Sequence, residues 1–228
     1  LSPRRRRWVE LLVVGSWVLA VAVWTWRLGA VDLRLAEVAR LTRSEVPTAL
    51  RLAAAWAGPA GSLLVWFAVV VSVLELAQGP TVRTASGGRS NAATRQGRWI
   101  GWFSTAGAVT LLAVAAPFRR RDEPALVGAG LNPVLEHPMM LVHPPLLYVA
   151  QAAVLGAAIV GLASSHEHDD DPVGRSAAER RSNRWTLVAT ALLVAASLLG
   201  AWWAHDELGW GGWWAWDPVE NTALAPLV

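Results

Sequence analysis

The stretch Trp202–Asn221, WWAHDELGWGGWWAWDPVEN, organises the rest of the chain. Six of the fifteen tryptophans lie between Trp202 and Trp216, with glycines among them. Tryptophan offers a rigid, flat apolar face, and glycine, which has no Cβ, lets a bulky ligand approach the backbone. The segment therefore predicts a binding platform for a flat molecule. The alternative is an aromatic belt at a membrane surface, but a belt explains only one or two tryptophans at each helix end.

A new helix is predicted to begin directly after this platform. Asp217 is a good N-cap, Pro218 suits the first helical position, and Glu220 completes a capping box three residues after the cap. The two acids therefore have two interpretations, helix capping and direct ligand contact, and both stay open.

The composition indicates a membrane protein. Of the 228 residues, 54% are hydrophobic and only 16% are charged, which is too apolar for an ordinary soluble domain. The absence of cysteine excludes disulfides, thiolate metal sites and a covalent haem-attachment motif in the chain itself. All twenty basic residues are arginines that lie between apolar blocks, so they do not indicate nucleic-acid binding.

Five apolar blocks are long enough to cross a bilayer as helices, which takes about twenty residues. The predicted fold is therefore all-α, a polytopic transmembrane helix bundle that forms a single domain over residues 1–228. Residues 29–58 mix apolar residues with spaced charges and predict interfacial helix segments on the outer face. Because the chain begins at Leu1 and stops at Val228 inside a newly capped helix, we expect a fragment of a longer protein. The predicted spans are about 8–26, 61–78, 99–118, 141–163 and 185–204, with a sixth starting at about 218.

The arginines predict the orientation. The N-terminal tail and residues 79–98 and 164–184 together hold twelve arginines, against seven in the loops of the other side. The positive-inside rule places the twelve in the cytoplasm and the tryptophan platform on the outer face.

We interpret residues 79–98 as a flexible linker. His166 and His168, beside three aspartates, are interpreted as part of a solvated acidic loop rather than a metal site.

His143 lies in a second landmark, LNPVLEHPMMLVHPPLLY, residues 131–148. Pro144 and Pro145 are tolerated only in the first turn of a helix, so His143 is predicted at the start of the fourth span. The fourth and fifth spans form an antiparallel pair, which returns the chain to the face of the platform. A histidine at a helix mouth beside flat aromatic rings is a candidate axial ligand for haem iron. An interfacial hydrogen-bonding histidine is the alternative.

These residues resemble a known family. WGGWWAWDPVEN, residues 210–221, is similar to the tryptophan-rich WWD signature of haem-handling proteins in cytochrome c biogenesis. The Pro-Val-Glu-Asn ending and HPPLLY at residues 143–148 resemble the CcmF haem lyases in particular, and residues 50–66 and 131–133 agree. The resemblance runs over roughly residues 4–228. It departs at Ala60, where the family usually has Glu, and at His205, where an aromatic residue is more usual.

The resemblance implies a multi-pass protein of the bacterial inner membrane whose tryptophan-rich segment lies on the periplasmic face. Such a protein holds haem b and promotes its attachment to the CxxCH thiols of apocytochrome c. The implied partners are the haem chaperone CcmE, apocytochrome c, CcmH/CcmI-type lyase subunits and membrane lipid. The alternatives are a CcmC-like carrier that delivers haem without ligation, and a scaffold that binds no haem. No general base is evident, and the family's further haem-ligating histidines fall beyond Val228.

The predicted haem site has His143 as the axial ligand of the iron. Arg119–Arg121 are added because arginine matches carboxylates bidentately and suits haem propionates; the alternative is that they are solvated or bind lipid headgroups. The other predicted contacts are Trp210, Trp213, Trp214, Trp216, Asp217 and Glu220, with Gly211, Gly212 and His205 as secondary candidates.

Overall fold

The computed structural model of the chain is built of helices joined by loops. It describes residues 3–77, 91–111, 113, 116–164, 172–208, 213, 214, 216, 221 and 225. Over these residues there is no β-strand, only one isolated antiparallel bridge, so the predicted all-α fold is confirmed. The elements are α1 (Pro3–Gly29), α2 (Ala36–Leu41), α3 (Thr48–Ala53), η1 (Ala54–Trp56), α4 (Pro59–Ala77), α5 (Asn91–Thr110), η3 (Pro133–Leu135), η4 (Pro138–Leu141), α6 (His143–Ser164) and α7 (Pro172–Leu208).

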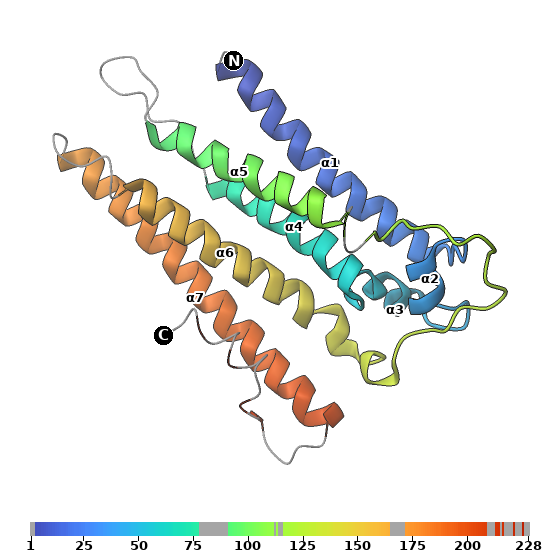
Figure 1. Cartoon of the computed structure of the whole chain (residues 1–228). Coiled ribbons are helices and arrows are strands. Elements are labelled where there is room, and N and C mark those ends of the chain that lie inside the picture. The colour runs from blue at the N-terminus through green and yellow to red at the C-terminus, as the bar shows by residue number, and fades with distance from the viewer. Residues whose placement is uncertain are drawn as a thin grey trace.

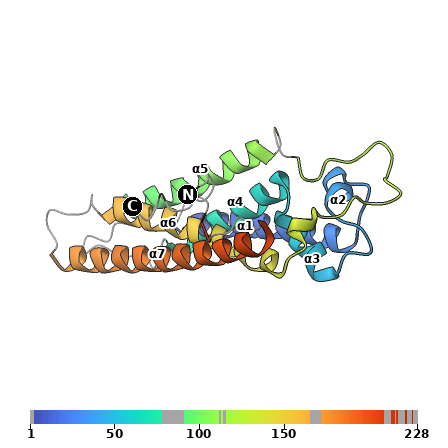
Figure 2. The ribbon, with the colours of Figure 1, turned by 90° about the horizontal axis from the view of Figure 1, so that it is seen from below.

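Helix α4 is the centre of the bundle. It packs against α1, α5 and α6, and Figure 1 shows it between α1 and α6. In its apolar window 61% of the residues are buried, against 17% in α1 and 22% in α7. Figure 2 shows α5 on one side of the row formed by the other long helices. The outer faces of α1 and α7 are therefore apolar and exposed, as expected for helices that face lipid.

Four helices are long and apolar enough to cross a membrane, by length and composition, within the described part of the chain. They are Arg7–Gly29, Pro59–Ala77, Pro138–Leu162 and Glu179–Glu207. These correspond to the predicted first, second, fourth and fifth spans. In the predicted third span, 99–118, α5 reaches Thr110 and the described residues Leu111 and Ala113 are π-helical, but α5 is not among the four. The predicted sixth span begins outside the described residues.

The predicted linker at residues 79–98 and the predicted loop at residues 164–184 are both shorter than expected. Residues 91–98 already belong to α5, and residues 172–184 already belong to α7. Both stretches are polar, which excludes a membrane span but not a helix, and their Ala, Arg, Gln and Glu residues are good helix formers. The predicted linker is therefore wrong for residues 91–98, and the predicted loop is wrong for residues 172–184. His166 and His168 lie outside the described residues.

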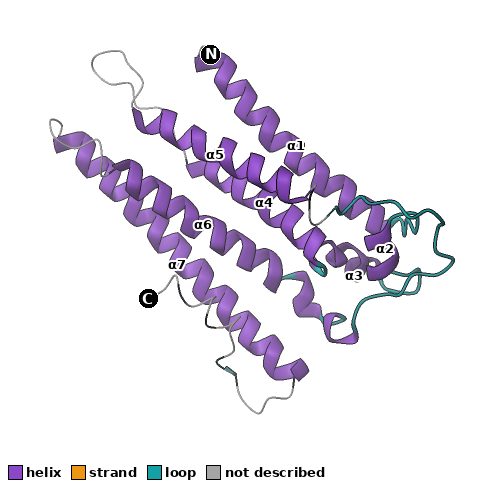
Figure 3. Ribbon diagram, in the orientation of Figure 1, coloured by secondary structure: helices purple, strands orange, loops and turns teal. Residues whose placement is uncertain are grey.

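The chain between α1 and α4 forms helical segments, as predicted for residues 29–58. These segments are α2, α3 and η1, and they gather with the longest loops at one end of the bundle (Figure 3). Trp24 of α1 is fully buried and its Nε1 donates to the Ala55 carbonyl at 3.1 Å. Trp56 Nε1 donates to the Met140 carbonyl at 2.7 Å. These two bonds attach the segments to α1 and to the approach to α6.

Helices α6 and α7 form the most extensive helix–helix contact and run antiparallel (Figure 1). Their buried contact is made by Ala150 of α6 with Leu193 and Ala196 of α7. Small residues let two helix backbones approach closely. The pair therefore brings the first turn of α6 against the last turns of α7, which is the juxtaposition that the sequence predicts.

Candidate functional site

The segment before η4, the first turn of α6 and the last turns of α7 carry a group of rings that we call the histidine–tryptophan cluster: His137, His143 and Trp203. The His143 and Trp203 rings meet edge to face, with centroids 5.8 Å apart. His137 stacks on Trp203 at 6.5 Å with an interplanar angle of 12°. Trp203 therefore lies beside both histidines, at the end of the bundle where α6 begins.

His143 is held against α7 by its own ring. Its Nδ1 lies 3.0 Å from the Ala196 carbonyl oxygen, which can only accept a hydrogen bond. The ring also lies directly over Gly200, because a Cβ added at Gly200 would be 2.6 Å from His143 Cε1. Only glycine leaves room for the ring at this position.

This hydrogen bond fixes the tautomer of His143. Since Nδ1 must donate its proton to the Ala196 carbonyl, the Nε2 of the neutral imidazole carries a lone pair. Metal-ligating histidines typically donate their other N–H to a carbonyl or carboxylate in this way. The imidazole of His143 is therefore oriented and protonated as an iron ligand requires.

His137 has the opposite arrangement. Its Nδ1 accepts a hydrogen bond from the Met139 amide at 3.1 Å, so this side chain caps η4. The neutral ring then carries its proton on Nε2, which lies 4.0 Å from both Asp206 Oδ2 and Glu207 Oε1. His137 thus points an N–H toward two carboxylates and offers no free lone pair.

The indole of Trp203 adds an unused donor. Its Nε1 is buried and has no hydrogen-bond partner among the described residues. A buried tryptophan N–H usually finds a partner, so this group is available to a bound polar atom. The cluster fits a haem by three features: an imidazole with a lone pair on Nε2, flat aromatic rings beside it, and an unpaired N–H donor.

The tryptophan platform is described only in part. Trp213 and Trp216 are exposed, and Trp214 meets Trp216 edge to face at 6.4 Å. His205 stacks on Trp213 with centroids 4.9 Å apart and planes within 7°, so the described contacts of His205 are with the platform and not with His143. The predicted contacts Trp210, Gly211, Gly212, Asp217 and Glu220 lie outside the described residues.

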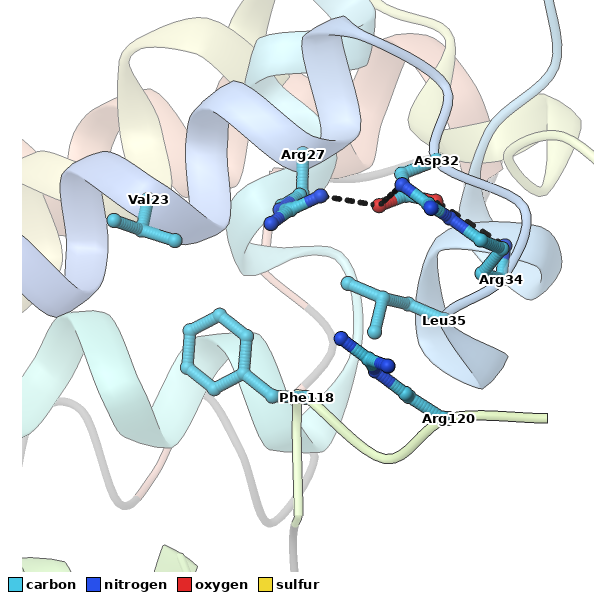
Figure 4. A pocket seen from close by; sticks show the side chains of 7 residues that line it. All are labelled: Val23, Arg27, Asp32, Arg34, Leu35, Phe118 and Arg120. Atoms are coloured by element: carbon cyan, nitrogen blue, oxygen red, sulfur yellow. Dashed lines mark hydrogen bonds and ion pairs between the residues drawn. The ribbon is translucent and has the colours of Figure 1, made fainter.

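Arg119, Arg120 and Arg121 lie at a different corner of the same end of the bundle. The Ala36 amide donates to the Arg119 carbonyl at 2.9 Å, and Arg121 Nε donates to the Glu123 carbonyl at 3.2 Å. Arg120 lines a small cavity beside the end of α1 (Figure 4). In the described part of the chain no contact joins these arginines to the histidine–tryptophan cluster.

Two residues of the cluster, His137 and Trp203, and the neighbouring Gly200 are not in the predicted site. His137 and Pro138 repeat the His-Pro pair of residues 143 and 144, and this repeat is a signal that the sequence contains. Trp203 lies in the predicted segment, but its contact with both histidines depends on how α7 is aligned along α6. Gly200 carries no local signal, since its role is to leave space for a ring from another helix.

Comparison with known proteins gives a consistent result. A family model described as "Cytochrome C assembly protein" matches residues 41–228. The chain is 38% identical over 214 residues to the "Probable cytochrome c-type biogenesis protein NrfE" of Escherichia coli (strain K12), covering 92% of this chain and 37% of that protein. It is 32% identical over 238 residues to the cytochrome c-type biogenesis protein CcmF of Pseudomonas aeruginosa, covering 98% of this chain and 34% of CcmF.

A solved structure agrees with the sequence relatives. The chain superimposes on a structure named "Cytochrome c Heme Lyase CcmF" with a TM-score of 0.71 and 26% identity, over 98% of this chain and 34% of that one. The chain thus spans about a third of the length of the relatives that it matches.

Proposed function

The chain belongs to the cytochrome c assembly protein family, in its CcmF/NrfE group, and we propose that it is part of a cytochrome c haem lyase. In this proposal haem is the substrate, and the protein holds it on the periplasmic face of the bacterial inner membrane. The observation that carries the proposal is the hydrogen bond from His143 Nδ1 to the Ala196 carbonyl. It leaves a lone pair on Nε2 of a ring that meets Trp203 edge to face, so an iron ligand and a flat surface lie side by side.

The residues of this chain have positioning roles in the proposal. His143 is the axial ligand, Gly200 provides the space for its ring, and Ala196 sets its tautomer. Trp203 and the platform rings provide flat surfaces. Haem supplies the vinyl carbons that the apocytochrome thiols attack, and the protein contributes orientation and proximity.

Further residues and partners belong to the same proposal. Trp210, Trp213, Trp214 and Trp216 would line the haem, together with Asp217 and Glu220. The haem chaperone CcmE would deliver the haem, and apocytochrome c and CcmH/CcmI-type subunits would dock at the same face. The third predicted span, 99–118, which includes the end of α5, is proposed to cross the membrane as well, and the segments between α1 and α4 are proposed to lie at the membrane surface.

The test is cytochrome c maturation in bacteria that lack their own lyase. The protein is expressed from its complete gene as wild type, His143→Ala and His205→Ala, with apocytochrome c as the reporter. We expect His143→Ala to abolish covalent haem in the cytochrome, whereas His205→Ala, a matched loss of an exposed histidine at the end of α7, retains most of it. Wild-type maturation by His143→Ala would contradict the proposal. Haem bound to wild-type protein without any covalent haem in the cytochrome would identify a carrier instead.

A further inference from the structure

The end of α1 carries a small cavity in a region that we call the arginine corner: Arg27, Arg34 and Arg120 with Asp32. The cavity has a volume of about 130 Å³. In Figure 4, Arg27 and Arg120 border it from opposite sides, and Phe118 and Leu35 form apolar walls between them. A cavity with guanidinium groups at its border and apolar walls suits the anionic head of an amphiphilic molecule.

The charges of the arginine corner are not balanced. The Asp32 carboxylate accepts hydrogen bonds from Arg27 Nη1 at 2.6 Å and from Arg34 Nε at 2.8 Å. The Arg34 guanidinium holds the pKa of the Asp32 carboxyl at about 2, so this group is ionised at neutral pH. One carboxylate against three guanidiniums leaves two positive charges. The guanidinium group of Arg120 makes no hydrogen bond or ion pair within the described part of the chain.

The backbone places Arg120 at the cavity. Leu35 and Arg120 form an antiparallel bridge, and the Arg121 amide donates to the Arg34 carbonyl at 2.9 Å. The segment that carries Arg120 is thus paired with the segment that carries Arg34. Because the two segments are already fixed, an anion that binds between them orders little further backbone.

The cavity lies at the level of the membrane surface. Arg27 is in the last turn of an apolar helix that is long enough to cross a membrane and ends at Gly29. The exposed Trp26 ring lies beneath its guanidinium, 4.8 Å away, and tryptophan is typical of this depth. Val23, one turn deeper, lines the cavity on the side of the hydrocarbon. A lipid could place its phosphate among the arginines and its chains along α1.

The volume restricts the ligand to a small head. Pockets that enclose drug-sized molecules measure about 300–1,000 Å³, so this cavity does not take up a haem macrocycle. No histidine lines it. Arginine pairs of this kind bind phosphate bidentately. We propose that the arginine corner binds the phosphate of an anionic phospholipid headgroup, independently of the proposed haem site.

The experiment measures lipid retention by the delipidated chain in detergent, by native mass spectrometry. The probes are phosphatidylglycerol and phosphatidylcholine, each with and without excess inorganic phosphate. The variants are wild type, Arg120→Gln and the matched control Arg119→Gln, which removes the same charge from the neighbouring residue. We expect about tenfold weaker retention of phosphatidylglycerol in Arg120→Gln, little change in Arg119→Gln, and weaker retention of phosphatidylcholine throughout.

Each other outcome decides the question. If inorganic phosphate displaces the lipid from wild type, the arginine corner still binds phosphate, but its ligand is a free anion and not a lipid headgroup. Retention of phosphatidylglycerol that falls equally in Arg120→Gln and Arg119→Gln, or in neither variant, would overturn the site. Of these two arginines only Arg120 lines the cavity, so a lipid bound there must distinguish the two variants. A haem affinity that falls in Arg120→Gln as strongly as lipid retention would overturn the lipid assignment in favour of a haem propionate.

Discussion

The histidine–tryptophan cluster and the arginine corner lie at the same end of the bundle but are built by different physical chemistry. In the cluster, close packing of α6 on α7 holds neutral rings, and a single hydrogen bond to the Ala196 carbonyl orients the His143 imidazole. In the arginine corner, paired backbone segments hold charged side chains that are only partly neutralised by Asp32.

The difference shows how one bundle end can select two kinds of ligand. An uncharged imidazole with a lone pair suits a metal ion, and flat rings suit a macrocycle. Uncompensated guanidiniums suit an anion of any shape that reaches them. Because no described contact joins the two regions, changes in one are expected to leave the other unaffected.

The largest expected effect is on the cluster, from Gly200→Ala. The new Cβ would lie 2.6 Å from His143 Cε1 and must displace the ring from the Ala196 carbonyl. We expect a loss of about 10- to 100-fold in haem affinity, as for other losses of an orienting partner, with unchanged phosphatidylglycerol retention. The measurement is haem titration in detergent.

The matched control is Gly161→Ala at the same helix pair, where the added Cβ would meet Ser182 Oγ at an ordinary 3.4 Å. Equal losses in both variants would mean that helix packing, and not the orientation of His143, controls haem binding.

A smaller effect is expected in the arginine corner as a function of pH. Folding lowers the pKa of Asp32 from its ordinary 3.8 to about 2. Its stabilising contribution is therefore complete above about pH 4 and is lost as the pH falls toward 2. Thermal unfolding of wild type and Asp32→Asn should show a difference in stability that shrinks over this range. A difference that stays constant from neutral pH to pH 2 would show that the carboxylate charge does not hold the corner together.

The smallest effect is expected from His137→Asn. Asparagine preserves the acceptor that caps η4, and His137 offers no lone pair beyond the one used for the Met139 amide. We expect haem affinity within about twofold of wild type, since the other two cluster rings, the indole of Trp203 and the imidazole of His143, remain. A changed ligation spectrum in this variant would show that His137, and not only His143, reaches the iron.

Local signals in the sequence predicted much of this fold. The apolar blocks located the four helices that are long enough to cross a membrane, and Pro144 and Pro145 placed His143 at the start of α6, where it is found. Polarity alone did not predict where the linker ends. Residues 91–98 are polar but helical, because several of them favour helix.

The sites were predicted less completely because they depend on tertiary alignment. His143 follows from its prolines, but its contact with Gly200 and Ala196 requires the register of α7 on α6. In the sequence, Arg119–Arg121 form one basic run in which the three residues look alike. In the structure, Arg120 pairs with Leu35 and is the one of the three that lines the cavity.

The most direct test of the account is the absorption spectrum of the haem-loaded chain in detergent. Wild type, His143→Ala and His205→Ala are compared, with added imidazole as a free axial ligand. We predict a six-coordinate spectrum for wild type and His205→Ala, and the loss of the protein ligand in His143→Ala. Haem that binds with the same ligation in His143→Ala as in wild type would contradict the central claim that the imidazole held on α7 is the iron ligand.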